Sequence, residues 1–282
     1  MPTPAAPAVL SSLRGAALAL SLALSLPAVA QTNGTTPRVV SELKDIRIKA
    51  ITSLPKASAG AHDRDCPQLV IQPKSAGAKL VAANGWAVMA DVPLGAYRAV
   101  SFAGDMQAGT SGTCGVSQGN VAVFNNDKLV ALAYGKSPED TVIGNLMPLE
   151  GGAVRVWDGD IAPSPAGDLH VEADGTLRLG KIADEDTVCQ GHAKVPNVYG
   201  MPIDKARKAL AAKGWNPVRA KASGDPRQAA LFKHGVIETD DCSGTGLAYC
   251  SYNYAGTAGK LSLTTVGDND LPSVADYNVK CR

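Results

Sequence analysis

The chain has 282 residues, of which 45% are hydrophobic, 19% charged and 5% aromatic. This length and apolar content allow one large or two modest domains, and they exclude a wholly disordered chain, which needs low hydrophobicity with a high net charge. The formal net charge is only +1, from 27 basic and 26 acidic residues, so there is no basic excess and we expect no nucleic-acid partner.

Residues 1–30 are typical of a secretory signal peptide. Arg14 is the single basic residue of this segment, and it precedes the apolar run 15–26 and the A-x-A sequence that ends at Ala30. The run is shorter than the ~20 residues that a membrane-spanning helix needs, which argues against an anchor. We therefore predict cleavage near Ala30 and export to the periplasm or the medium, with no transmembrane segment in the mature chain.

Export determines how the cysteines are interpreted. All six follow residue 30: Cys66, Cys114, Cys189, Cys242, Cys250 and Cys281. An even number in an oxidising compartment favours three disulfides, although six cysteines allow fifteen pairings. Neither C-x-x-C nor H-E-x-x-H occurs and the four histidines are scattered, so the sequence predicts no metal site and no cofactor.

Residues 31–65 are expected to be a flexible lead-in. They contain one candidate strand, in which Ile46, Ile48 and Ala50 alternate with Arg47 and Lys49.

Residues 66–188 are expected to form an antiparallel β sandwich or barrel. Strands are predicted at 68–72, 85–91, 96–102, 120–124, 128–134, 153–157, 169–172 and 176–179. Turns are predicted at 93–95, 125–127 and 174–175, where Pro, Asn, Asp and Gly gather. A short helix is predicted over 76–84, ending at Gly85.

The glycine-rich segment 104–119 is a candidate binding loop. Ser111 and Thr113 would offer hydroxyl groups to a ligand, and a disulfide at Cys114 would hold the loop in shape. Residues 115–119 also match G-x-S-x-G, which would make Ser117 the nucleophile of a hydrolase. A strand pattern follows instead of the helix that this motif requires, so we favour a simple glycine-rich loop.

Three aspartates surround the loop 161–167. Asp158, Asp160 and Asp168 could supply oxygen ligands to calcium, but their spacing does not match the EF-hand pattern. Turn formation by Asp-Gly pairs is the simpler interpretation.

The last third, residues 189–282, has a different character. Ile203, Ala206, Ala209 and Leu210 form the apolar stripe of a helix, with Gly214 suited to its end. Strands are predicted at 236–239, 247–254 and 260–266. Tyr252 and Tyr254 would share one face of their strand, where they either stack on a sugar or belong to the core, and we favour the core.

This segment resembles a PASTA domain over roughly 195–267, about a quarter of the chain. The resemblance rests on the opening Val-Pro-Asn-Val-x-Gly-Met of 195–201, on the helix Asp-Lys-Ala-Arg-Lys-Ala-Leu of 204–210 and on the Lys-Gly-Trp of 213–215. Gly235-Val-Ile and Lys260-Leu-Ser-Leu-Thr also match the family's strand positions. The resemblance implies one helix packed on a small three-stranded sheet. It also implies an extracellular role, which in some members is the binding of peptidoglycan fragments.

On this layout the cysteines fall into three pairs. Cys189–Cys281 would join the two ends of the C-terminal module, Cys242–Cys250 would close a short loop, and Cys66–Cys114 would crosslink the β domain.

The sequence therefore predicts a mainly β protein with an α+β C-terminal module. We expect an exported, non-catalytic binding or scaffolding protein of the cell envelope, with a peptidoglycan fragment or an envelope protein as partner. The alternatives are a secreted hydrolase that uses Ser117, and an inhibitor of a secreted enzyme such as a lysozyme.

Overall fold

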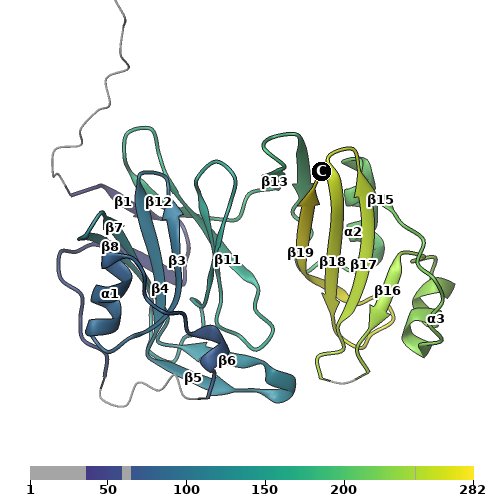
Figure 1. Ribbon diagram of the computed structural model, residues 1–282, viewed down its shortest axis with the longest axis horizontal. Coiled ribbons are helices and arrows are strands. Elements are labelled where there is room, and N and C mark those ends of the chain that lie inside the picture. The colour runs from purple at the N-terminus through teal and green to yellow at the C-terminus, as the bar shows by residue number, and fades with distance from the viewer. Residues whose placement is uncertain (1–35, 59–64, 245) are drawn as a thin grey trace, which may run out of the picture. The chain divides into compact units, whose positions relative to one another are not determined.

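The computed structural model describes residues 36–58, 65–244 and 246–282, so the expected signal peptide lies outside the described residues. Residues 36–282 form one compact unit. Strands make up 43% of the structure and helices 13%, which confirms the mainly β class (Figure 1).

Two five-stranded sheets form the β domain, here residues 39–180 (Figure 1). One sheet has the order β1 (Val39–Ser41), β12 (Leu177–Gly180), β11 (Pro165–Val171), β10 (Val154–Trp157) and β9 (Leu146–Pro148). The other has the order β2 (Ile46–Ala50), β8 (Lys128–Gly135), β7 (Asn120–Asn125), β4 (Tyr97–Ala103) and β3 (Ala87–Leu94). The β1–β12 pair is parallel and the other pairs of these sheets are antiparallel.

The core of this domain lies between the two sheets. Val121 and Ala133 from one sheet meet Val154 and Leu177 from the other in a single apolar cluster, and all four are buried. Neither sheet closes on itself, so the domain is a sandwich, one of the two predicted forms. The alternating strand patterns explain the sandwich, because alternate residues of each strand place their apolar side chains on the inner face of its sheet.

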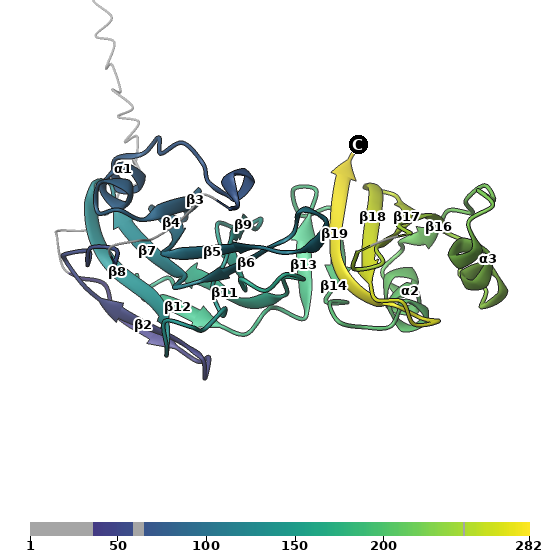
Figure 2. The ribbon, with the colours of Figure 1, turned by 90° about the horizontal axis from the view of Figure 1, so that it is seen from below.

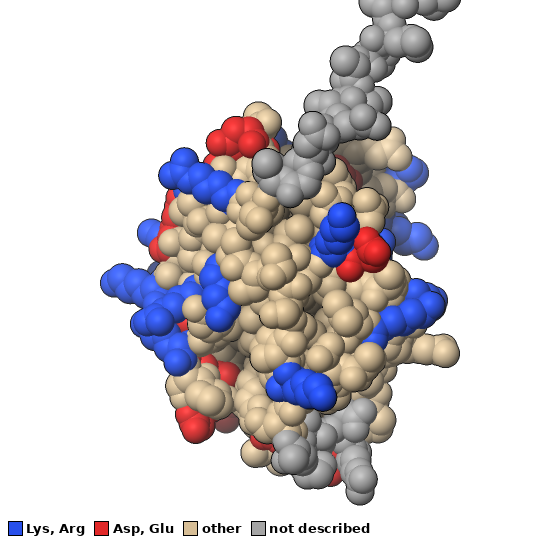
Figure 3. Space-filling view, turned by 90° about the vertical axis from the view of Figure 1, so that its left-hand side faces the viewer, with Lys and Arg blue, Asp and Glu red and all other residues tan. Residues whose placement is uncertain are grey.

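The helix α1 (Ala76–Ala83) packs on the other side of the β2–β8–β7–β4–β3 sheet through a second apolar cluster. Ser75 caps it by accepting a hydrogen bond from the amide of Ala78, and Gly85 follows it with φ +87°, as the predicted stop requires. Figure 3 views the molecule from this side. It shows lysine and arginine side chains set apart by uncharged surface, with acidic side chains among them.

Two local predictions for the β domain are wrong. Residues 67–69 form the 3-10 helix η1 (Pro67–Leu69) because Pro67 occupies its first turn and favours that geometry over a strand. Pro93 lies within β3 instead of in the turn, since β3 is an edge strand and needs no amide on its open side. The candidate strand of the lead-in is confirmed as β2 (Ile46–Ala50), and the lead-in also supplies β1, which was not predicted.

Two hairpins lie outside these sheets. The first consists of β5 (Asp105–Ala108) and β6 (Cys114–Ser117), joined by a loop that contains the 3-10 helix η2 (Thr110–Gly112). The second, the connecting hairpin, consists of β13 (Glu185–Val188) and β14 (Ala193–Pro196) and leads into the C-terminal module.

The C-terminal module, residues 189–282, is an α+β unit. Its sheet has the order β15 (Asn216–Pro217), β17 (Cys250–Gly256), β18 (Gly259–Val266) and β19 (Ser273–Cys281), with β16 (Thr239–Cys242) also paired to β17. Figure 2 shows β19 as the curved strand at the end of this sheet. The helix α2 (Ile203–Ala212) buries Ile203, Ala206 and Leu210, the predicted stripe.

This module is larger than the resemblance implies. It holds a second helix, α3 (Pro226–Lys233), and five strands in its sheet instead of three. Residues 236–238 form a turn, because the amide of Val236 bonds back to the end of α3 and the strand therefore begins only at Thr239.

The disulfides are the three expected pairs: Cys66–Cys114, Cys189–Cys281 and Cys242–Cys250. Such crosslinks are characteristic of proteins that fold in an oxidising compartment outside the cytoplasm. Among the described residues, no helix has the length and apolar character to cross a bilayer.

Candidate functional site

The two tyrosines that were candidate sugar platforms are core residues. Tyr252 is 0% exposed and Tyr254 is 1% exposed, and both lie in the apolar cluster of the C-terminal module. The Tyr252 hydroxyl bonds to Thr265 at 3.0 Å, and the Tyr254 hydroxyl donates to Glu238 at 2.8 Å. Their rings offer no face to a ligand, so the ligand-binding role of this pair is wrong and the core interpretation is confirmed.

The candidate binding loop lies in the β5–β6 hairpin. Ser111 falls in η2, and its side chain lies outside the described part of the structure. The Thr113 hydroxyl donates to the carbonyl of Thr110 at 2.7 Å, which closes the turn. Cys114 ties the hairpin to the segment before η1 through Cys66, so Thr113 has a defined place on the wall of the cleft described below.

Ser117 lies at the end of β6 and its Oγ donates to Asp105 Oδ2 at 3.1 Å. The strand β7 follows it, as the glycine-rich loop interpretation expects. The described residues that line the hollow around Ser117 include no histidine and no lysine. A serine nucleophile needs an adjacent base with an orienting partner, and this arrangement does not provide the set.

The three aspartates around 161–167 are divided between two places. Asp168 is 7% exposed and pairs with Arg155, whereas Asp158 and Asp160 belong to the β10–β11 loop. No group of three or more His, Cys, Asp or Glu among the described residues is arranged to hold a metal ion. The turn interpretation fits this loop, because Asp158 Oδ1 accepts hydrogen bonds from the amides of Asp160 at 3.2 Å and Ser164 at 3.0 Å.

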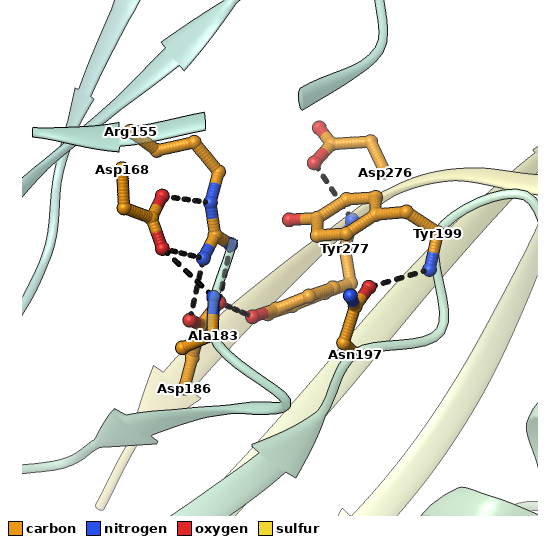
Figure 4. A network of polar contacts seen from close by, with 8 residues as sticks. All are labelled: Arg155, Asp168, Ala183, Asp186, Asn197, Tyr199, Asp276 and Tyr277. Atoms are coloured by element: carbon orange, nitrogen blue, oxygen red, sulfur yellow. Dashed lines mark hydrogen bonds and ion pairs between the residues drawn. The ribbon is translucent and has the colours of Figure 1, made fainter. Parts of the chain in front are cut away.

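Arg155 lies at the centre of a buried polar network between the β domain and the C-terminal module (Figure 4). Its side chain is 1% exposed, and its guanidinium donates to Asp168 at 2.8 and 2.9 Å and to Asp186 at 2.6 and 2.8 Å. The Tyr277 hydroxyl from β19 also donates to Asp186. Arg155, the connecting hairpin and the module are thereby joined by charge-assisted hydrogen bonds.

Aromatic rings surround this network. The Tyr199 ring stacks on Tyr277 with centroids 5.3 Å apart and meets Trp157 edge-on at 5.4 Å, and the Arg155 guanidinium lies 5.6 Å from the Tyr199 centroid. Burial would lower the pKa of Arg155, but its hydrogen bonds to the two aspartates outweigh that effect and raise it. Burial raises the pKa of Tyr199 to about 12, so this phenol stays neutral. The charges of the network are matched within the chain, whereas the buried Tyr199 hydroxyl beside them has no hydrogen-bond partner among the described residues.

A cleft of about 620 Å³ lies beside this network. Its walls from the β domain are Gln68, Leu69, Met89, Gly112, Thr113, Cys114, Val116 and residues 144–147 and 157–163, and its walls from the module are Tyr249, Thr264, Ala275 and Asp276. This volume is within the range of small-molecule sites, about 300–1,000 Å³. Most of the lining is apolar, and Ile161, which is 39% exposed, offers a large hydrophobic side chain to a ligand.

Close backbone packing fixes the wall that carries Asp158. The amide of Val116 donates to the carbonyl of Gly159 at 2.6 Å, and the amide of Gly144 donates to Trp157 at 2.6 Å. A Cβ at Gly159 would lie 2.3 Å from the Val116 carbonyl oxygen, so glycine is required for this approach. The β10–β11 loop is therefore held against β6, with its carboxylates in place.

The charged lining of the cleft is entirely acidic. It contains Asp158, Asp160 and Asp276, and none of the described lining residues is a lysine, arginine or histidine. Burial raises the pKa of Asp158, and the amides of Ser164 and Asp160 offset this only in part. Burial also raises the pKa of Asp276, which stands at the accessible rim and accepts a hydrogen bond from the Tyr277 amide at 2.7 Å.

Of the candidate ligand-binding and metal-binding residues found in the sequence, Thr113, Asp158 and Asp160 line this cleft. The sequence did not point to Arg155 or Asp276. A lone arginine between two valines in Val154-Arg-Val-Trp157 was a usable signal, because a charge in a strand that is buried throughout needs a partner. Asp276 had no such signal, since it reaches the cleft only through the packing of β19 beside the β domain.

Comparison of the chain with protein-family models, with curated proteins and with solved structures gives no match. The cleft and the network are therefore interpreted from their own geometry.

Proposed function

We propose that this protein is an exported, non-catalytic binding protein of the cell envelope that holds a peptidoglycan fragment in the cleft between the β domain and the C-terminal module. The observation that carries the proposal is the cleft itself. It has the volume of a ligand site, an apolar lining with few polar groups, and walls contributed by both parts of the molecule.

The resemblance of residues 195–267 to PASTA domains supports the envelope as the place of action. The residues that carry the resemblance are central to the module, since Val195, Val198, Ile203 and Leu210 are all 0% exposed. The three disulfides support export to an oxidising compartment. Neither observation identifies the ligand, which is why binding has to be measured directly.

Co-sedimentation with purified peptidoglycan sacculi tests the proposal, using the protein from Gln31 to Arg282. We expect saturable binding that weakens by at least about fivefold in Ile161→Ser, because this change removes apolar contact area from the cleft wall. Leu80→Ser is the matched control, since Leu80 is 40% exposed on α1 and lies away from the cleft.

Absence of binding to sacculi would contradict the proposal and would direct attention to an envelope protein as the partner. Equal loss in Ile161→Ser and Leu80→Ser would show that the cleft is not the binding site. Retained circular dichroism and thermal unfolding in both variants would show that each change is local.

A further inference from the structure

Basic residues are concentrated in one segment of the chain. Residues 203–234, which run from the start of α2 to just after α3, contain eight lysines and arginines and two acidic residues. The rest of 31–282 contains 18 basic and 24 acidic residues. The near-zero overall charge therefore combines a segment of charge +6 with a remainder of charge −6.

Most of these basic side chains have no partner within the chain. Three are engaged: Arg207 and Lys213 pair with glutamates, and Arg227 donates to backbone carbonyls. The other five are exposed, and their side chains form no ion pair or hydrogen bond with any described residue. They are called the basic face here and consist of Lys205, Lys208, Arg219, Lys221 and Lys233.

The segments that carry the basic face meet around residues 235–238. The Arg207 guanidinium on α2 donates to the carbonyl of Gly235, just after α3, at 2.6 Å. The amide of Ala220, which stands between two residues of the basic face, donates to the carbonyl of Ile237 at 2.9 Å. Figure 2 shows α3 at the end of the molecule opposite the β domain, with α2 on the same side of β19. Contacts within the module thus bring the two helices and the segment between them together.

Acidic side chains near the basic face are fewer. Asp225 is engaged as the cap of α3, and its charge is balanced by the engaged Arg227. Asp204 lies in the first turn of α2, and the exposed Asp240 and Asp241 follow on β16. Five free cationic groups against these three carboxylates leave a net positive surface on a molecule whose remainder is acidic.

We propose that the basic face docks the protein on an anionic lipid surface. Four of its five residues are lysines, which act as hydrated point charges, whereas recognition of a single phosphate favours the planar fork of arginine. Separate lysines over two helices and a loop match a surface of many headgroup phosphates, which attracts each of them. The acidic remainder of the molecule is repelled by the same surface, so the module faces it.

An exposed apolar side chain favours lipid over a dissolved polyanion. Val218, next to Arg219, is 44% exposed, more than any other large apolar side chain among the described residues. At a membrane, basic residues bind the headgroups while apolar side chains enter the boundary with the acyl chains. A dissolved polyanion has no such apolar layer. This docking goes beyond the proposed function, because it uses a different surface and does not depend on peptidoglycan.

Vesicle co-sedimentation tests the proposal with the 31–282 protein. The vesicles are phosphatidylcholine, either alone or with about one third phosphatidylglycerol. We expect binding at least about tenfold stronger to the anionic vesicles, and this binding should fall as salt is raised because ions screen the attraction.

Two variants with the same net charge locate the docking surface. The first removes four lysines of the basic face and should weaken binding to anionic vesicles by at least about tenfold: Lys205→Gln, Lys208→Gln, Lys221→Gln and Lys233→Gln. The matched control removes four exposed lysines of the β domain that form no ion pair with a described residue, and it should stay within about twofold of the parent: Lys44→Gln, Lys74→Gln, Lys79→Gln and Lys128→Gln. Unchanged thermal unfolding in both variants shows that the losses are not due to misfolding.

The apolar contribution is tested by Val218→Ser. It should weaken vesicle binding by about twofold, because it removes the side chain that enters the lipid boundary. Ile71→Ser is the control, since Ile71 is 38% exposed in the β domain.

Equal losses in the two lysine variants would overturn the basic face as the docking surface, because net charge alone would explain them. Equal binding to neutral and anionic vesicles would also overturn the proposal. Binding to a soluble polyphosphate without binding to vesicles would overturn it in favour of a dissolved polyanion. Binding to sacculi is measured separately, so either proposal fails without the other.

Discussion

The Arg155 network and the cleft are neighbouring regions between the same two parts of the molecule, but they treat charge in opposite ways. In the network, one guanidinium satisfies two aspartates, and a phenol supplies a further donor. In the cleft, three aspartates stand without a basic partner among the described residues. The difference shows that the charges of the first region are balanced within the chain, whereas those of the second have no basic partner among the described residues.

The contrast follows from desolvation. A buried charge is stable only when its partners replace the water it has lost, and Arg155 with Asp168 and Asp186 meets that condition. Asp158 keeps part of its contact with water, and the raised pKa of its carboxyl reflects the part that it has lost. A binding site has to retain such unmet groups, because a site that is already satisfied gains little from a ligand.

The largest expected effect comes from removing the guanidinium. Arg155→Met should lower the free energy of unfolding by about 3–5 kcal/mol, because it leaves Asp168 and Asp186 buried without a cation. Equilibrium denaturation in urea measures this change.

Arg178→Met is the control for losing an arginine that is only partly buried. Arg178 pairs with Glu42 and Glu172 close to solvent, where ion pairs contribute little, so we expect a much smaller loss than in Arg155→Met. A similar loss in the two variants would contradict the distinction between a buried network and a surface ion pair.

The sequence predicted the β sandwich well for a physical reason. Strand alternation and turn residues are local signals, so the hairpins β7–β8 and β11–β12 and the helix α1 could be predicted from neighbouring residues alone. The disulfide pairing also followed from the layout, because each expected pair falls within one part of the chain.

The helix α3 shows where local signals were present but incomplete. Asp225 caps it through the amides of Arg227 and Gln228, and Pro226 occupies its first turn, which is a usual start signal. Its buried face, however, consists mainly of Gln228 and Leu231, so no apolar stripe marks it. The Gln228 side chain is satisfied by the backbone carbonyls of residues 221, 239 and 240, which are tertiary contacts that a sequence pattern does not show.

The cleft could be predicted only in part for a related reason. Thr113 and Asp158 lie in loops that composition marks as turns, but their neighbours Tyr249 and Asp276 come from the module more than 90 residues later. The docking that joins them depends on Arg155 and Tyr277, whose partners are also distant in the chain.

A smaller effect is expected from Tyr277→Phe. The change removes one hydroxyl that donates to the Asp186 carboxylate, while Arg155 continues to hold the same aspartate. Because hydrogen bonds to charged groups contribute about 1.5–3 kcal/mol, the loss should stay below that of Arg155→Met. Urea denaturation of both single variants and of the double variant measures their coupling, and fully additive losses would show that the tyrosine is not part of the network.

The smallest effect is expected in the cleft, and it has the opposite sign. Burial raises the pKa of Asp158 above its ordinary 3.8, so folding favours the protonated carboxyl, and this residue costs stability once pH rises through the folded-state pKa. Asp158→Asn should therefore unfold like the parent protein at pH 3.5 and should be slightly more stable at pH 7, by less than about 1 kcal/mol for a half-exposed group. Thermal unfolding across this pH range measures the difference, with Asp127→Asn, in the exposed tip of the β7–β8 hairpin, as the control for a lost charge. A variant less stable than the parent at pH 7 would mean that the Asp158 carboxylate is already compensated within the chain, and the contrast between the cleft and the Arg155 network would then fail.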